Sequence, residues 1–116
     1  MGTFVISKRV NDFYKFEFVS RKGKTIFTSN SYELKFECED EIELLKVSAE
    51  SFDYLKFKSS QAKYFFKIVL NEKSFATSRK YATEVMMQKG IDEIIKYISK
   101  AEILDFSNTD TIFENV

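Results

Sequence analysis

The chain has no histidine, no proline and no tryptophan among its 116 residues, and it has one cysteine and three glycines. Without histidine it lacks the usual general base near neutral pH, the Ser-His and Cys-His dyads, and the commonest metal ligand. The glycines at positions 2, 23 and 90 are too far apart to form a glycine-rich phosphate loop. These absences exclude the simplest catalytic designs, so we expect a protein that is not an enzyme and needs no cofactor.

No excess of one charge marks the whole chain, because 18 basic residues balance 18 acidic ones. This balance excludes a strong overall attraction to nucleic acid, membrane or an acidic substrate. The charge is uneven along the chain, however: residues 51–100 carry 10 basic and 5 acidic side chains, and residues 101–116 carry 4 acidic side chains and no basic ones. The second half is therefore basic and the C-terminal end acidic.

Long apolar runs are also missing, and none approaches the ~20 residues that a membrane-spanning helix needs. A length of 116 residues is sufficient for one domain with an ordinary core. Cys38 cannot form an internal disulfide, and Lys8 interrupts the opening apolar run. These features predict a protein of a reduced compartment, most simply the cytoplasm.

What the sequence does have is an internal repeat. The positions that match, in order, are Tyr14 and Tyr64, Phe16 and Phe66, Phe18 and Ile68, Ile26 and Phe75, Thr28-Ser29 and Thr77-Ser78, Tyr32 and Tyr81, Cys38 and Met87, Ile42 and Ile91, and Leu45 and Ile94. A repeat of this length predicts that each half is one supersecondary unit that buries its apolar face against the other.

Each half is predicted to contain three strands and a helix. Residues 4–8, 13–19 and 25–29 have the alternation and the turn signals of a three-stranded meander, and the helix pattern begins at about Glu33. Thr83 is the expected N-cap of the second helix. The residues that recur at helical spacing are Leu34, Cys38, Ile42, Leu45 and Ala49 in the first half, and Thr83, Met87, Ile91, Ile94 and Ile98 in the second.

After the second helix the sequence starts a third copy of the pattern but does not complete it. Residues 101–106 repeat the character of residues 49–54, and a strand there needs a sheet to pair with. The predicted fold is α+β: tandem β-β-β-α repeats with a terminal strand, an antiparallel sheet packed against two helices, and pseudo-twofold symmetry. Residues 1–106 form the single domain, with repeats at about 2–51 and 52–106, and residues 107–116 are expected to be a loosely held tail.

The paired order of these motifs resembles the YegP-like proteins, a bacterial class of small domains of unknown function. The segments that carry the resemblance are residues 2–8, Tyr14-x-Phe16-x-Phe18, Thr28-Ser29-x-x-Tyr32 and residues 38–42, with Tyr64-x-Phe66, Thr77-Ser78-x-x-Tyr81 and Gly90-Ile91 in the second half. The family has Asn-Gly-Ile in the helix, where this chain has Asp40-Glu41-Ile42 and Lys89-Gly90-Ile91.

The resemblance covers about residues 2–106. It implies tandem units, or two single-unit chains, that share a sheet and exchange the strand after each helix, here residues 52–57 and 103–106. It implies no catalytic residues.

Several residues that could carry chemistry have a simpler structural interpretation. Cys38 lies on the buried stripe of its helix and matches Met87, so we expect an inert core thiol. Thr28-Ser29 and Thr77-Ser78 precede the helices and are expected to cap them or to form turns. The acidic side chains of the first helix, Glu37, Glu39, Asp40, Glu41 and Glu43, point in different directions and are expected to form a solvated face rather than a metal site.

One surface is a candidate contact site. Lys63, Phe65 and Lys67 share a face of one strand in the basic half. An aromatic ring between two lysines on an open sheet can stack on a base while the ammonium groups contact phosphate. The alternative is that a neighbouring strand or subunit covers Phe65 and that the lysines are solvated at its rim.

The sequence therefore predicts a small, non-catalytic cytoplasmic binding or interaction protein that needs no metal or cofactor. We expect a monomer with an internal pseudo-dimer, and a protein as its partner. Weak binding of single-stranded nucleic acid by the basic second repeat is the alternative.

Overall fold

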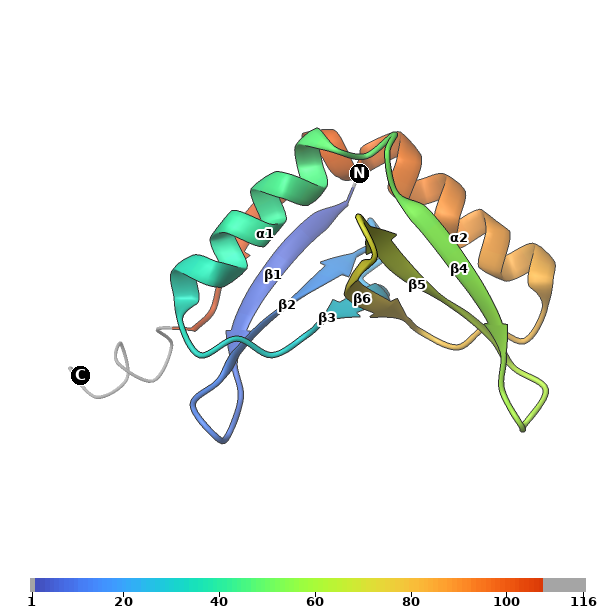
Figure 1. Cartoon of the computed structure of the whole chain (residues 1–116), viewed down its shortest axis with the longest axis horizontal. Coiled ribbons are helices and arrows are strands. Elements are labelled where there is room, and N and C mark those ends of the chain that lie inside the picture. The colour runs from blue at the N-terminus through green and yellow to red at the C-terminus, as the bar shows by residue number, and fades with distance from the viewer. Residues whose placement is uncertain (1, 108–116) are drawn as a thin grey trace.

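A computed structural model describes residues 2–107 and shows one sheet with two helices above it (Figure 1). Of the expected tail, all but Ser107 lies outside the described residues. The elements in chain order are β1 (Thr3–Lys8), β2 (Tyr14–Val19), β3 (Thr25–Ser29), α1 (Lys35–Val47), β4 (Asp53–Lys58), β5 (Tyr64–Leu70), β6 (Lys73–Ser78), α2 (Glu84–Tyr97), a 3-10 turn (Ile98–Lys100) and β7 (Glu102–Asp105). The predicted order β-β-β-α, twice, followed by a terminal strand is confirmed.

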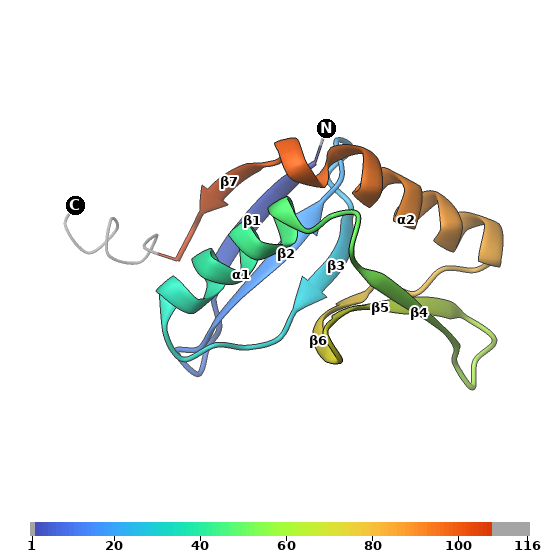
Figure 2. The ribbon, with the colours of Figure 1, turned by 45° about the horizontal axis from the view of Figure 1, so that its top comes forward.

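Within residues 2–107 the sheet has seven strands, in the order β4-β5-β6-β3-β2-β1-β7. It is mixed, so the prediction of an antiparallel sheet is wrong at one position: β7 pairs parallel to β1, with Thr3 opposite Glu102 and Ile6 opposite Asp105. The reason is geometric. The N-terminus and the end of α2 meet at the apex of the molecule, so both strands start there and run outward in the same direction (Figures 1 and 2).

Both helices cover the same face of the sheet, and the strand residues that alternate toward that face are apolar and buried. In β2, Phe16 and Phe18 are buried, and in β5, Phe66 and Ile68 are buried. They pack in one core with Cys38, Ile42 and Leu45 of α1 and with Met87, Ile91 and Ile94 of α2. Burial of each large apolar side chain contributes about 1.5–3 kcal/mol to the stability of the fold. The buried side chains of each helix recur at a spacing of three and four residues, which places them on one face of the helix.

The same backbone arrangement occurs in both halves of the chain. Tyr14 and Tyr32 exchange two backbone hydrogen bonds of 2.7 and 2.8 Å, and Tyr64 and Tyr81 do so at 2.8 and 2.7 Å. The halves meet where β3 pairs antiparallel with β6, and there Thr28 lies opposite Thr77. The strands of both halves therefore form one continuous sheet.

The prediction of which residues cap the helices is correct only in part. Thr83 does cap α2, because its Oγ1 accepts a hydrogen bond of 3.1 Å from the Met86 amide. Ser29 and Ser78, however, belong to strands and cap nothing: they accept hydrogen bonds of 2.8 and 2.9 Å from the amides of Phe16 and Phe66. Ser29 and Ser78 follow Thr28 and Thr77, which lie opposite Glu17 and Lys67, so their hydroxyls lie beside the next residues of the neighbouring strands, and sequence spacing alone could not show this.

The two edges of the sheet are not alike. At one edge β7 covers β1, and the Phe106 amide continues the pairing with a 2.8 Å hydrogen bond to the Ile6 carbonyl. At the other edge, no strand within residues 2–107 pairs with the outer side of β4 (Figure 2). Neither helix of this part of the chain is long and apolar enough to cross a membrane.

Candidate functional site

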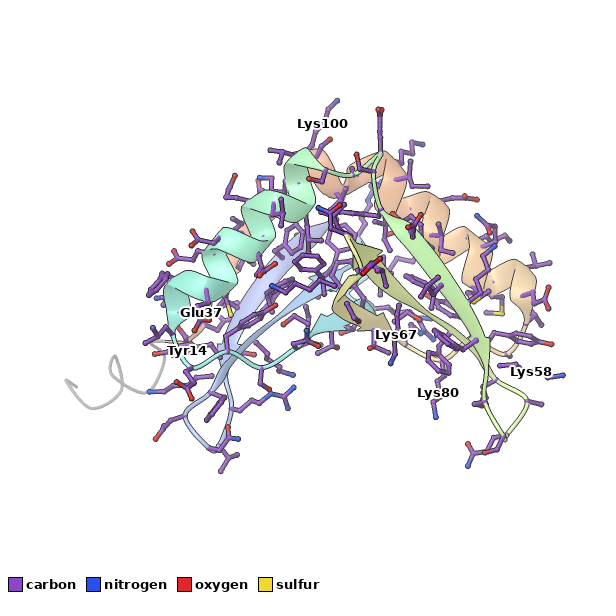
Figure 3. The ribbon with its side chains drawn as sticks, viewed as in Figure 1. Tyr14, Glu37, Lys58, Lys67, Lys80 and Lys100 are labelled. Atoms are coloured by element: carbon purple, nitrogen blue, oxygen red, sulfur yellow. The ribbon has the colours of Figure 1, made fainter. Side chains whose placement is uncertain are left out.

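Phe65 and Lys67 lie on β5 with their side chains on the face that the helices leave open. Their neighbours Phe66 and Ile68 point the other way, into the core. Figure 3 shows Lys67 below the sheet, away from both helices. Lys63 is exposed in the turn that precedes β5, where its amide donates a 3.2 Å hydrogen bond to Ser59 Oγ. The structure thus brings Phe65 and Lys67 together on one strand, with Lys63 at its end.

Strand β4 adds two residues to this face that the sequence analysis did not single out. Phe57 lies opposite Phe65, with ring centroids 5.2 Å apart and nearly parallel planes, and Lys67 Nζ is 5.8 Å from the Phe57 ring. Leu55 lies opposite Lys67 and is 48% exposed. The alternation of residues 53–58 could have identified both. Phe57 is 40% exposed and Phe65 is only partly exposed, so the more accessible ring is that of Phe57.

The matching face of the first half has its charges neutralised. Lys15 Nζ is 3.4 Å from Glu17 Oε1, and the Thr25 hydroxyl donates a 3.0 Å hydrogen bond to the same carboxylate. Lys67, in contrast, has no carboxylate within ion-pair distance among residues 2–107. The positive charge of the candidate site is therefore not compensated locally.

The free edge of β4 offers backbone groups as well as side chains. Lys56 lies opposite Phe66, whose amide is turned toward Ser78 and away from β4. Facing residues of an antiparallel pair either both bond across it or both point outward. The amide and carbonyl of Lys56 therefore point to the free edge, and those of Lys58, opposite Tyr64, do the same.

The side chain of Lys56 occupies a place that is apolar in the first half. There Ile6, opposite Phe16, is buried under the helix and beside β7. Lys56 instead reaches toward α2 and donates a 3.0 Å hydrogen bond to Gln88 Oε1. Lysines pointing inward at a sheet edge discourage indiscriminate strand pairing, so the exposed β4 edge is not open to any apolar strand.

Lys58 lies next to Lys56 on the same side of β4. Its Nζ is 5.7 Å from the centre of the Tyr64 ring (Figure 3). Both lysines line a hollow of about 220 Å³ between β4 and α2, together with Phe57, Tyr64, Glu84 and Met87. The edge thus presents two cations on its helix side and two apolar side chains, Leu55 and Phe57, on its open side.

Cys38 is not part of this site. It is fully buried between the sheet and α1, and burial raises the pKa of its thiol to about 12, with a further contribution from Glu37 and Glu39. A thiol with so high a pKa stays protonated at neutral pH, which agrees with the expected inert core position.

The acidic residues of α1 do not converge. Glu39, Asp40 and Glu43 are exposed, and Glu41 Oε1 pairs with Lys73 Nζ at 2.9 Å. Within the described part of the chain, no three acidic or cysteine side chains come close enough together to hold a metal ion.

Three known proteins are similar to this chain over nine tenths of its length. A UPF0339 protein encoded in the 5′ region of the ptx operon of Stutzerimonas stutzeri is 28% identical over 109 residues, which are 92% of this chain and 98% of that protein. No family model matches the sequence.

The other two similar proteins have solved structures. The UPF0339 protein of Shewanella oneidensis superposes with a TM-score of 0.83 at 26% identity, over 91% of this chain and 92% of that one. The E. coli protein yegP, described as of unknown function, superposes with a TM-score of 0.79 at 24% identity, over 91% and 93% of the two chains.

Proposed function

The chain is YegP-like in sequence and in fold, and from this premise we propose that it is a non-catalytic binding module that takes an extended segment of a partner protein along the β4 edge. The observation that carries the proposal is the unpaired edge of β4, where backbone groups of Lys56 and Lys58 point outward. Strand addition to a sheet edge is a common mode of peptide recognition, in which backbone bonds supply affinity and alternate side chains supply specificity.

The chemistry of the partner follows from the two sides of β4. A strand laid along it has alternate side chains near Lys56 and Lys58 and the others near Leu55 and Phe57. The complementary segment therefore alternates acidic and apolar residues. Strand β7 is an internal example, because its Asp105 pairs with Lys35 of α1 while its backbone adds to β1.

The proposal includes tandem repeats related by a pseudo-twofold axis, in a monomer. The support is the matched Tyr–Tyr backbone pairs and the Thr28–Thr77 contact at the joint of the halves. Under this symmetry β4 corresponds to β1. Because β1 has a partner strand, a strand added to β4 would occupy the matching place. A cytoplasmic location is also part of the proposal, and it rests on the chain having one cysteine, Cys38, which is buried and has no disulfide partner.

Peptide binding tests this function. A short fluorescent peptide that alternates glutamate and valine is titrated with the protein at low salt, and fluorescence anisotropy reports binding. We expect saturable binding that is lost when lysine replaces glutamate in the peptide, or when alternate peptide amides are N-methylated. Lys56→Pro, which removes one outward amide without breaking a bond to β5, is expected to weaken binding at least tenfold.

Charge reversal provides the specificity control. Lys56→Glu with Lys58→Glu is expected to abolish binding of the acidic peptide, whereas Lys100→Glu, at the apex and far from Lys58 (Figure 3), leaves it unchanged. Binding that survives both the proline and the N-methylated peptide would contradict edge pairing. Equal losses for the Lys56/Lys58 and Lys100 variants would indicate only nonspecific charge attraction.

Single-stranded nucleic acid is the second candidate ligand, favoured by the uncompensated Lys67 beside the Phe57 ring. In that case binding weakens with salt, Phe65→Ala and Phe57→Ala each lose ~1–3 kcal/mol of stacking, and Lys63→Ala and Lys67→Ala flatten the salt dependence. We expect no retention of a labelled oligonucleotide even at low salt. Retention that depends on these four residues would instead favour the nucleic-acid function.

A further inference from the structure

A second surface, which shares no residue with β4 or β5, has four basic residues around one hollow of about 250 Å³. Lys22 and Lys24 come from the turn between β2 and β3, Arg79 from the loop after β6, and Lys89 from α2. All four are exposed, and Glu93 is the only acidic residue among residues 2–107 that lines the hollow. The chain as a whole has no net charge, so this is a local concentration of positive charge.

The floor of the hollow includes Tyr81 and Gly90. Tyr81 is 7% exposed, and burial raises the pKa of its hydroxyl, which therefore remains a hydrogen-bond donor. A Cβ atom at position 90 would lie 2.4 Å from the Tyr81 hydroxyl oxygen, so only glycine leaves room for that oxygen. The glycine thus helps to keep the space beside Tyr81 open.

The matching place in the other half shows that the fold does not require this basic character. Aligning Cys38 with Met87 and Ile42 with Ile91 pairs Glu41 with Gly90 and Lys24 with Lys73. Lys73 is neutralised there by Glu41, at 2.9 Å. Lys24 has no such partner, because the second half has Gly90 in place of the glutamate, and no carboxylate of residues 2–107 lies within ion-pair distance of Lys24.

Two more pairs of matching residues differ in charge, and in both pairs the second half has the basic residue. Asn30 and Asp40 of the first half correspond to Arg79 and Lys89. Asn30 uses its side chain to donate a 2.8 Å hydrogen bond to the Ser74 carbonyl, whereas the Arg79 guanidinium lies 5.1 Å from the centre of the Tyr81 ring, at the hollow. At this hollow the second half thus has cations and a glycine where the first half has acidic and neutral groups.

We propose that this basic hollow binds a compact, multiply charged phosphate compound. Four cations against one carboxylate favour an anion of more than one charge, and arginine and lysine donors form their strongest hydrogen bonds with phosphate oxygens. The volume is below the usual range of drug-sized ligand sites, which favours a small ligand. The Tyr81 hydroxyl supplies a neutral donor at the base.

Calorimetric titration of the full chain with inorganic pyrophosphate at low salt, without divalent cations, tests this proposal. We expect saturable binding of one pyrophosphate per chain. Lys24→Gln is expected to weaken it about tenfold, because a charged hydrogen-bond donor is removed. Lys73→Gln, the matched variant on the other half, is expected to leave it unchanged.

A double variant gives a sharper comparison without disturbing the core. Arg79→Asn with Lys89→Asp gives the hollow the residues found at the matching place, both positions are exposed, and binding is expected to be lost. Titrations with orthophosphate, phosphoserine and citrate define the ligand, and each is expected to bind more weakly than pyrophosphate.

Three results would overturn the proposal: no saturable heat with pyrophosphate, equal effects of Lys24→Gln and Lys73→Gln, or a double variant that binds as wild type does. Citrate or orthophosphate binding as tightly as pyrophosphate would overturn the assignment to a multiply charged phosphate. The hollow shares no residue with β4 or β5, so failure of peptide binding at the edge leaves this outcome unaffected.

Discussion

At the scale of single residues, the buried serines of β3 and β6 stabilise the fold through hydrogen bonds with the backbone. Each hydroxyl accepts a hydrogen bond from a core amide and donates one of 2.7 Å to the next carbonyl, that of Asn30 or Arg79. An amide left without a partner in the core costs about 1–3 kcal/mol. These serines therefore stabilise the sheet at Phe16 and Phe66.

Ser78→Ala is expected to lower the free energy of unfolding by about 1–3 kcal/mol, because the Phe66 amide loses its acceptor. Urea denaturation measures the loss, and Ser29→Ala is expected to give a similar value through Phe16. Ser74→Ala, at an exposed site of the same strand β6, is the control. If Ser78→Ala cost no more than Ser74→Ala, the hydroxyl would not be needed.

The thiol of Cys38 gives a second prediction at this scale. Because it is buried and its pKa is about 12, native protein is expected to react with a thiol reagent far more slowly than denatured protein does at pH 7. Raising the pH toward 9 is expected to change the native rate little, since the thiol stays protonated. Equal native and denatured rates would place Cys38 at the surface and reopen a redox role.

At the scale of elements, β7 is the strand that extends the sheet beyond the β-β-β-α order of the two halves. It pairs with β1 and partly covers it with Ile103 and Leu104, which are themselves 39% and 44% exposed. A chain that ends at Ala101 is expected to be less stable by about 1–3 kcal/mol than one that ends at Ser107, in line with the partial burial of two apolar side chains and the uncovered β1 edge. Equal melting temperatures for the two chains would show that β7 contributes nothing.

The contact between β7 and α1 is electrostatic and depends on pH. Burial alone would raise the pKa of Asp105, but its hydrogen bonds with Lys35 and Ser107 outweigh burial and lower the pKa below its ordinary 3.8, while the pKa of Lys35 is raised. Asp105 therefore stabilises the fold above its ordinary pKa, and this stabilisation disappears as the pH falls through the lowered value.

Asp105→Asn is expected to cost about 0.5–1 kcal/mol at pH 7, and the difference from wild type is expected to shrink as the pH drops below about 4. Urea denaturation across this pH range measures it. Lys35→Met in both backgrounds isolates the pair, because the effect of Asp105→Asn is expected to be small once Lys35 is gone. A difference that persists at low pH would mean that the charge of Asp105 is irrelevant.

At the scale of the whole molecule, most of the fold follows from local patterns. Alternation identified the strands around Phe16 and Phe66, and helical spacing identified the faces of Cys38 and Met87, because burial on one side dictates both periods. The direction of β7 could not be predicted in this way. It depends on where α2 delivers the chain, which is a property of the assembled halves.

The candidate sites also combine residues that local patterns predict with residues that they do not. Phe65 and Lys67 were identified from one strand, but Phe57 and the free edge depend on which strand lies beside β5 and which edge remains uncovered. The basic hollow joins Lys24 and Arg79 across the two halves, so no local spacing could indicate it. Sequence reasoning is strong within an element and weak where distant elements meet.

The most direct test of the central claim, an accessible β4 edge that accepts a strand, is residue-resolved amide hydrogen exchange. In the free protein, the amides of Lys56 and Lys58 are expected to exchange fast and those of Leu55 and Phe57 slowly, because only the latter bond to β5. Saturation with the glutamate–valine peptide is expected to slow Lys56 and Lys58. Unchanged fast exchange at these two residues, with the peptide bound, would contradict the account.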